Sequence, residues 1–284
     1  MTGTEVPGEP ANDGPPPGSK LDPSVAHIAR VRDYWLGGRD NFAVDRQVGD
    51  AALAAFPGLV GSVRTTRAFL GRAVRYLAAN AGIRQFLDIG AGIPTASSTH
   101  EVAQSIAPDA LVCYVDRDPV VFGHARALLA SGPHGRTSYL EADLRDTGKI
   151  LAEAASMLDL TQPVAVLLNG VLQFIPDDAD PGGIVTMLVD AMPPGSFLVL
   201  SHPASDLGRE ARPDPGSPLG RLLAGPVTRR SHDQVSRFFD GLRLLPPGLV
   251  RPPEWRPDPA EPDPADRVAG PAGGPDLWGG VGQK

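Results

Sequence analysis

The apolar positions of this chain fall into short continuous runs that alternate with longer segments of helical spacing. The short runs predict strands near residues 84–89, 111–116, 136–141, 163–169 and 196–201. The longer segments between them predict helices near residues 96–107, 119–130, 148–157 and 182–192. Strands that alternate with helices in this way form a parallel sheet with right-handed crossovers. The pattern therefore predicts a doubly wound α/β fold with helices on both faces of the sheet.

The segments on either side of this alternation extend the prediction. Helical spacing over residues 45–56 and 64–79 indicates two helices before the first strand. Ser231 and Gln234 form a capping box that predicts a further helix, and Leu242–Leu245 has the composition of a sixth strand. A last strand near 276–282 would be added antiparallel at the sheet edge.

These elements divide the chain into a tail and one domain. Prolines dominate residues 1–22, which we expect to be disordered, and the domain covers residues 23–284. We expect a helical lid over residues 23–82 and an α/β core over 83–251. A Pro-rich loop over 252–275, too poor in apolar residues to pack, precedes the last strand at 276–284.

Composition narrows the class of protein. A length of 284 residues suits one α/β domain, and a net charge of −7 argues against a nucleic-acid partner. The single cysteine, Cys113, excludes an internal disulfide, and its apolar neighbours indicate a core residue. The first ten residues lack an apolar block and no run reaches the length of a membrane span, so we expect a cytoplasmic protein with no membrane partner. The six histidines lack metal-ligand spacing, and no metal site is expected.

The first predicted strand runs into an acidic, glycine-spaced turn, Asp88-Ile89-Gly90-Ala91-Gly92. Glycines at 90 and 92 let the backbone bend sharply and let a ligand come close. A dinucleotide site would need a third glycine at position 95, which is Thr95, and the Asp88 carboxylate would repel a pyrophosphate. That carboxylate would instead attract a cation such as the amino end of S-adenosylmethionine. An ordinary turn is the alternative interpretation.

Two further acids follow the next two strands. Asp116 ends the second strand 26 residues after Gly90 (116 − 90), which is near the spacing expected of a carboxylate that binds ribose hydroxyls. The alternative role for Asp116 is a helix N-cap, and Asp118 competes for that role. Asp143 follows the third strand, where it could accept from an adenine amino group beside the Leu144 N–H, or belong to a solvated turn. Since parallel strands end at one edge of a sheet, we expect these acids to converge on one pocket.

Longer motifs outside the turn resemble those of a known family. RDYWLGGRDNFAVDR, residues 32–46, is similar to the amino-terminal signature of S-adenosylmethionine-dependent methyltransferases once listed only as a domain of unknown function. Residues 238–242 and 277–282 resemble the carboxyl-terminal part of that family, and the resemblance covers roughly residues 21–284. It implies a class I methyltransferase-like fold with a mostly parallel seven-stranded sheet, an N-terminal helical lid and S-adenosyl-L-methionine as the cofactor.

The resemblance also implies roles for residues of the signature. Tyr34, Gly38 and Asn41 would face the cofactor, although an ordinary turn is the alternative for the glycines. Arg64 or Arg67 could hold the carboxylate of the cofactor, or could belong to a solvated helix face. The complete expected cofactor-binding set is Asp88, Gly90, Gly92, Asp116, Arg117, Asp143, Leu144, Asn169, Tyr34, Gly38, Asn41 and Arg67.

The sequence says less about the residues that would bind the methyl acceptor. The segment 204–226 looks shorter than the family pattern, and Gln173 stands where a histidine often would. Transfer from a sulfonium depends mainly on in-line positioning, but a poor nucleophile would also need a base, for which Tyr34 and His202 are the candidates. His202 is alternatively a strand-end residue bonded to a loop. The prolines typical of base-amino methylation are absent after Asn169, which disfavours that reaction.

Three hypotheses follow. The first is an S-adenosylmethionine-dependent methyltransferase that acts on a small-molecule acceptor. The second is a non-catalytic module that binds S-adenosylmethionine or S-adenosylhomocysteine. The third is an NAD-dependent oxidoreductase, which Thr95 and Asp88 both oppose.

Overall fold

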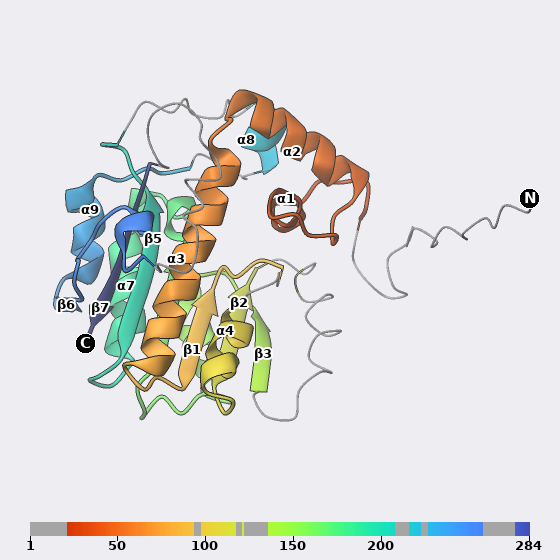
Figure 1. The fold of residues 1–284 in the computed structure, drawn as a ribbon. Helices are drawn as coiled ribbons and strands as arrows, with labels where there is room; N and C mark the ends of the chain where they lie inside the picture. Colours follow the sequence, from red (N-terminus) through yellow and green to blue (C-terminus); the bar gives the residue numbers. More distant parts are fainter. Residues whose placement is uncertain are drawn as a thin grey trace, which may run out of the picture.

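The computed structural model describes residues 22–93, 98–117, 121, 136–207, 216–222, 227–257 and 276–284. A seven-stranded sheet in the order β3-β2-β1-β4-β5-β7-β6 forms its centre (Figure 1). The strands are β1 (Gln85–Ile89), β2 (Leu111–Asp116), β3 (Arg136–Glu141), β4 (Ala165–Asn169), β5 (Phe197–Pro203), β6 (Arg243–Leu244) and β7 (Leu277–Gln283). The chain moves outward from β1 to β3 and returns to β4 beside β1. The strand order therefore reverses between β1 and β4, at the place where open α/β sheets bind ligands.

The first five strands are parallel to one another, whereas β7 pairs antiparallel with both β5 and β6. This arrangement confirms the mostly parallel, seven-stranded class I sheet. It corrects the expected position of the last strand, because β7 lies between β5 and β6 and the edge is formed by β6.

Glycines let β7 fit into this interior position. A Cβ at Gly282 would lie 2.8 Å from Cδ1 of Phe239, and a Cβ at Gly280 would lie 3.3 Å from Cζ of the same ring. The strand therefore needs residues without side chains where Phe239 packs closely against it. The glycines that weaken the strand pattern in the sequence are what permit the packing.

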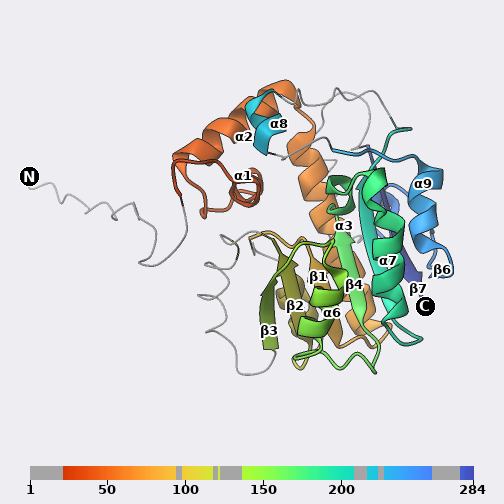
Figure 2. The ribbon, with the colours of Figure 1, turned by 180° about the vertical axis from the view of Figure 1, so that it is seen from behind.

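Helices cover both faces of the sheet (Figures 1 and 2). One face carries α3 (Leu59–Ala79) and α4 (Thr99–Ile106), whose apolar residues form a core with Phe86 and Val112. The other face carries α6 (Thr147–Ala154), α7 (Pro181–Asp190) and α9 (His232–Ser236). Cys113 is buried in the core, as predicted. The helix expected near 119–130 lies outside the described residues apart from Val121.

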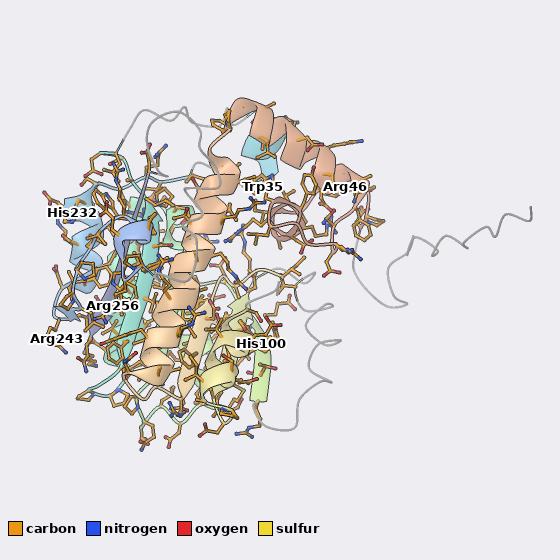
Figure 3. All side chains as sticks on the ribbon, viewed as in Figure 1. Trp35, Arg46, His100, His232, Arg243 and Arg256 are labelled. Carbon is orange, nitrogen blue, oxygen red and sulfur yellow. The ribbon has the colours of Figure 1, made fainter. Side chains whose placement is uncertain are left out.

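The amino-terminal helices α1 (Ile28–Trp35) and α2 (Ala43–Ala55), with the short α8 (Pro218–Leu222), lie beyond the carboxyl ends of the strands (Figure 1). Val31 and Trp35 of α1 and Ala52 of α2 form a small core against the start of α3, and the Trp35 indole N–H donates to the Gly49 carbonyl oxygen at 3.3 Å (Figure 3). The predicted lid over 23–82 is thus only partly a lid, because α3 belongs to the sheet core. The tail over residues 1–22 falls outside the described part except Asp22. No helix of the described ranges is long and apolar enough to cross a membrane.

The start of the Pro-rich segment packs, contrary to the sequence prediction. Trp255 follows the short helix η4 (Pro252–Glu254) and is fully buried against Phe69 and Tyr76 on α3. Arg72 fixes the segment by donating from Nε to the Trp255 carbonyl oxygen at 3.0 Å and from Nη2 to the Pro252 carbonyl oxygen at 2.6 Å. Trp255 alone thus provides an apolar contact that the polar and proline-rich composition of residues 252–257 did not lead us to expect. Residues 258–275 lie outside the described ranges.

Candidate active site

A cavity of about 380 Å³ lies at the carboxyl ends of β1, β2 and β4 and is covered on one side by α1. The strand ends contribute Gly90, Asp116 and Gly170 to its wall, and α1 contributes Ala29 and Arg32. Its other lining residues are Ala26, His27, Ile28, Ile89, Gly92, Val115, Arg117, Ala142, Asp143, Leu144, Arg145, Val171, Phe174, Ile175 and Arg221. The predicted acids Asp116 and Asp143 therefore do meet at one pocket, as the parallel sheet requires.

The glycine turn after β1 forms the floor of this cavity. Gly90 and Gly92 have φ angles of +76° and +68°, in the left-handed region that favours glycine. A Cβ at Gly90 would lie 2.6 Å from Cγ2 of Val171, so position 90 also requires close approach. The Gly92 N–H donates to Oδ2 of Asp116 at 2.9 Å, which ties the turn to the end of β2. Positions 94 and 95 of the motif, and Asp118, lie outside the described residues.

Asp143 lies on the wall of the same cavity but is held by arginine. Arg145 donates from Nε to Oδ1 at 2.9 Å and from Nη2 to Oδ2 at 2.7 Å, and Arg117 Nη1 lies 3.9 Å from Oδ2. The Arg145 hydrogen bonds lower the pKa of Asp143 to about 2. The carboxylate is therefore a permanent acceptor whose orientation is fixed at the edge of the cavity, beside the buried Leu144.

A second, smaller cavity of about 30 Å³ adjoins the first, and Ala29, Arg32, Gly90 and Gly92 line both. Its other walls come from the strand ends and from α1 and α3, through Asp33, Leu36, Val63, Arg67, Leu70, Asp88, Ala91, Ile93 and Asn169. The structure thus brings the predicted residues Asp88, Arg67 and Asn169 together, while Arg64 is exposed on α3.

Asp88 is a buried acid of this site. The Thr99 hydroxyl donates to its Oδ2 at 2.6 Å, and the side chain is 3% exposed. Burial raises the pKa of Asp88 to about 6, against the opposing effects of the Thr99 hydrogen bond and the Arg67 and Arg32 charges. A buried carboxylate whose charge is only partly balanced favours a cationic ligand beside it.

Arg32 is a site residue that the sequence reasoning missed. It projects from α1 into both cavities, and burial lowers the pKa of its guanidinium while the charges of Asp116 and Asp88 oppose that shift. The residue stands in the amino-terminal signature, so the signal was present. Only the packing of α1 over the strand ends shows that Arg32 faces the acids.

Three predicted residues of the signature do not line either cavity. The Tyr34 hydroxyl donates to Oδ1 of the exposed Asp50 at 2.7 Å, so the ring faces α2. Asn41 Nδ2 donates to Oδ2 of Asp33 at 2.9 Å, and a Cβ at Gly38 would lie 1.9 Å from Oδ1 of Asp33. Gly38 and Asn41 therefore hold Asp33, which does line the smaller cavity. The structure favours a turn that positions a neighbour over direct contact with a ligand.

His202, the other candidate base, is fully buried on β5 away from the cavity linings. Its Nδ1 lies 2.9 Å from the Pro203 carbonyl oxygen, and its Nε2 accepts from Arg230 Nη1 at 2.7 Å. Burial lowers the pKa of His202 to about 4, which keeps the ring neutral with both nitrogens engaged. This is the strand-end role that was the alternative to catalysis. Gln173 likewise does not line the two cavities.

The comparison with known families decides the class of this site. A family model described as S-adenosyl methyltransferase matches residues 16–284. The chain belongs to the S-adenosyl methyltransferase family. The protein is accordingly an S-adenosylmethionine-dependent methyltransferase, as the signature and the glycine turn led us to expect, and the oxidoreductase hypothesis is set aside.

Solved structures of similar chains agree with this assignment. A DUF574 family protein from Streptomyces avermitilis MA-4680 is 40% identical, with a TM-score of 0.80 over 92% of this chain and 98% of that one. A protein from Thermobifida fusca YX, described as a candidate methyltransferase, is 38% identical, with a TM-score of 0.76 over 95% and 98% of the two chains. Magnesium protoporphyrin IX methyltransferase from Synechocystis PCC 6803, solved with bound S-adenosylhomocysteine, is 15% identical with a TM-score of 0.51 and shares the fold. No curated protein matches the chain.

The residues of the two cavities fit the methyltransferase cofactor. S-adenosylmethionine combines a neutral nucleoside with a sulfonium and an amino acid end. The larger cavity offers Asp116, Asp143 and the apolar side chains of Leu144 and Ile89, which suit ribose hydroxyls and an adenine ring. The smaller cavity offers Asp88 for cations and Arg67 for a carboxylate. Bound there, the cofactor supplies an activated methyl group.

Proposed function

We propose that this methyltransferase transfers a methyl group directly to a small-molecule acceptor, with the residues of the two cavities in stated roles. Asp116 accepts from the ribose hydroxyls, Asp143 and Leu144 border the adenine, and Asp88 faces the amino end of the cofactor. Arg67 holds the carboxylate of the cofactor. These roles are supported by the convergence of the side chains on adjoining cavities that share the Gly90–Gly92 turn.

The covering of the site by α1 is the observation that supports a small acceptor. Side chains of α1 and α3 line the smaller cavity opposite Asp88 and Asn169, so α1 covers the place where the amino acid end of the cofactor would lie. Leu36, Val63 and Leu70 contribute apolar side chains to the wall of this cavity. A folded macromolecule cannot reach this point without displacing α1, whereas a small molecule can enter beside it. The rate then comes from in-line positioning.

A turnover screen tests the proposal. The protein is incubated with methyl-labelled S-adenosylmethionine and either the small-molecule fraction or the macromolecular fraction of a bacterial extract. We expect label to enter one or a few small molecules, and to do so only with an intact cofactor site. Label confined to protein or nucleic acid would contradict the proposal, and so would cofactor binding without any transfer, which is the behaviour of a non-catalytic module.

Removal of the Asp116 carboxylate should weaken cofactor binding. Asp116→Ala deletes a charge-assisted acceptor, so calorimetry should show a loss of about 1.5–3 kcal/mol in the free energy of S-adenosylmethionine binding. Asp178→Ala, at an exposed position of the helix η2 (Asp177–Ala179), is the matched control and should leave the affinity unchanged. Equal affinity in both variants would remove the ribose role from Asp116.

The raised pKa of Asp88 predicts a pH effect on stability. The folded state keeps the Asp88 proton up to about pH 6, whereas the unfolded chain loses it near 3.8. The folded state therefore binds the extra proton between these values, and stability falls as pH rises through this window and stays lower above it. Urea unfolding of the ligand-free protein should show that Asp88→Asn, which can keep the Thr99 bond, gains stability over the wild type at neutral pH but not at about pH 4.

The same substitution should affect the cofactor in the opposite direction. Asp88→Asn removes the charge that faces the ammonium, so S-adenosylmethionine should bind more weakly than to the wild type above about pH 6, and the difference should shrink below that pH. Binding to the wild type should itself weaken as pH falls below about 6, because the carboxylate is then protonated. A variant that binds the cofactor like the wild type while still gaining stability would show that Asp88 does not face the amino group.

A further inference from the structure

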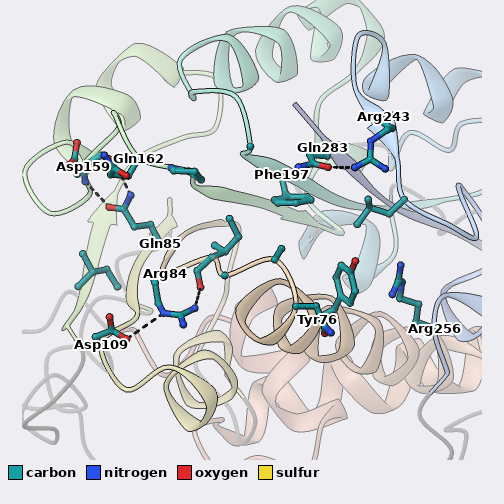
Figure 4. A pocket seen from close by; sticks show the side chains of 18 of the residues that line it. Tyr76, Arg84, Gln85, Asp109, Asp159, Gln162, Phe197, Arg243, Arg256 and Gln283 are labelled. Carbon is teal, nitrogen blue, oxygen red and sulfur yellow. Dashed lines mark hydrogen bonds and ion pairs between the residues drawn. The ribbon is translucent and has the colours of Figure 1, made fainter.

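A third cavity, which we call the groove, lies at the opposite end of the sheet from the cofactor site (Figure 4). Its volume is about 780 Å³, and its walls include Gln85 at the start of β1, Phe197 at the start of β5 and Gln283 at the end of β7. The five residues of β1 separate it from the Gly90 turn, a distance of roughly 16 Å at 3.3 Å per residue. A molecule bound here cannot receive a methyl group, so this groove is not the acceptor site.

The charged side chains of the groove are sorted between its two ends (Figure 4). At one end, Arg84 Nε lies 3.5 Å from Oδ1 of Asp109, and the Asp159 carboxylate accepts from the Thr161 N–H at 3.0 Å and hydroxyl at 2.6 Å. The charges at this end are therefore already paired or hydrogen-bonded.

The other end carries two arginines that lack an acidic partner within the described ranges, Arg243 and Arg256. Arg243 donates to the amide oxygen of Gln283, and Arg256 donates from Nε to the Pro246 carbonyl oxygen at 3.2 Å. Both partners are neutral, so among the described residues neither guanidinium is paired with a carboxylate. Figure 3 shows both arginines on the flank of β6, far from α1. Each guanidinium at this end of the groove is an electrostatic counterpart of an anion.

Arg256 is held rigidly in place. Its φ is +44°, in the left-handed region that non-glycine residues rarely adopt, and its guanidinium lies 3.9 Å from the centre of the Tyr76 ring. The preceding Trp255 is fully buried, and Arg72 fixes its carbonyl group. Strained backbone that neighbouring contacts maintain is concentrated at sites that bind or react. The fold thus presents this guanidinium instead of letting it move freely in solvent.

We propose that the groove is a binding site for a small organic oxyanion, a carboxylate or a phosphate ester attached to an apolar or aromatic body. A guanidinium forms charge-assisted, forked hydrogen bonds to such oxygens, and the groove offers one from Arg243 and one from Arg256. Phe197, Leu245 and Pro246 line the same cavity and offer an apolar surface for the rest of the ligand. Because the groove joins the end of α3 to β6 and β7, ligand binding stabilises the folded chain. The proposal does not depend on the identity of the methyl acceptor.

Calorimetry on the full chain with phenyl phosphate, benzoate, inorganic phosphate and benzyl alcohol tests this site. We expect phenyl phosphate or benzoate to bind saturably, inorganic phosphate to bind more weakly, and benzyl alcohol not to bind. The stronger of the first two identifies the ligand group as a phosphate ester or a carboxylate. Benzyl alcohol binding as tightly as both oxyanions, or no binding by any of the four probes, would overturn the proposal.

Variants assign the binding to the two arginines. Arg243→Gln should weaken the oxyanion at least tenfold. Arg256→Gly should do the same, and it suits the positive φ, so a folding defect is not expected to explain the loss. Arg237→Gln, exposed on the helix η3 (Arg237–Phe239), is the control and should bind like the wild type. S-adenosylmethionine affinity should be unchanged in all three. An equal loss in the control, or undiminished binding in both groove variants, contradicts the assignment.

Discussion

Replacing Asp45 by alanine should cost about 3–5 kcal/mol of unfolding free energy and should weaken the cofactor site as well. Asp45 is fully buried, and its Oδ2 lies 2.8 Å from Nε of Arg30, which is itself 1% exposed. The substitution leaves the Arg30 charge buried without its carboxylate, and an uncompensated buried charge is among the most destabilising changes in a protein core.

The same carboxylate also fixes the beginnings of two helices. Oδ1 of Asp45 accepts from the His27 N–H at the start of α1, and Oδ2 accepts from the Phe42 N–H at the start of α2, both at 2.8 Å. Since α1 covers the cofactor cavity, its loosening should reduce S-adenosylmethionine affinity at least tenfold, which calorimetry measures.

Two further variants separate this effect from a general one. Asp50→Ala on the same helix breaks only the exposed contact with Tyr34, so urea unfolding should show a loss within about 1 kcal/mol. The double variant Arg30→Met, Asp45→Leu replaces the ion pair by apolar side chains, so it should recover the part of the loss that comes from the unpaired Arg30 charge, but not the part that comes from the two helix-start hydrogen bonds. Equal losses in Asp45→Ala and Asp50→Ala would mean that the buried pair does not hold the lid.

Replacing Trp255 by alanine should destabilise the protein by about 3–5 kcal/mol, because it opens a cavity against α3. The ring is fully buried and makes edge contacts with Phe69 at 5.6 Å and Tyr76 at 6.1 Å between ring centres. Thermal unfolding gives the measurement. The cofactor affinity of the folded fraction should be preserved, since Trp255 lines neither cavity of the active site.

Trp278→Ala provides the matched control for this prediction. Trp278 is only partly buried on β7, and its indole N–H donates to Oδ1 of Asp206 at 2.8 Å in an exposed contact. Its removal should therefore cost clearly less than that of Trp255. If the two tryptophan variants unfolded at the same temperature, the described start of the Pro-rich segment would not be part of the core.

Much of the sheet was predictable because a central parallel strand is buried on both faces, so its sequence is a local run of apolar residues. The expected strand near 111–116 coincides with β2, and β1, β4 and β5 begin within two residues of their predicted positions. The edge strand β3 also coincides with its expected range, 136–141, although none of its residues is buried. The convergence of Asp116 and Asp143 was also predictable, because parallel order sends both strand ends to one edge. Trp255 and β7 were not, since their burial depends on partners distant in the sequence.

The candidate site shows the same division. The sequence by itself determined the S-adenosyl methyltransferase family, the α/β order and the acidic glycine turn, because these are properties of neighbouring residues and of their spacing. Only the tertiary structure decided that Asn41 donates a hydrogen bond to Asp33 and that buried His202 accepts one from Arg230. It also decided that Arg32 lines the same cavity as Asp88. A side chain takes its direction and charge environment from elements packed against it, and those elements are set by the whole core instead of the local chain.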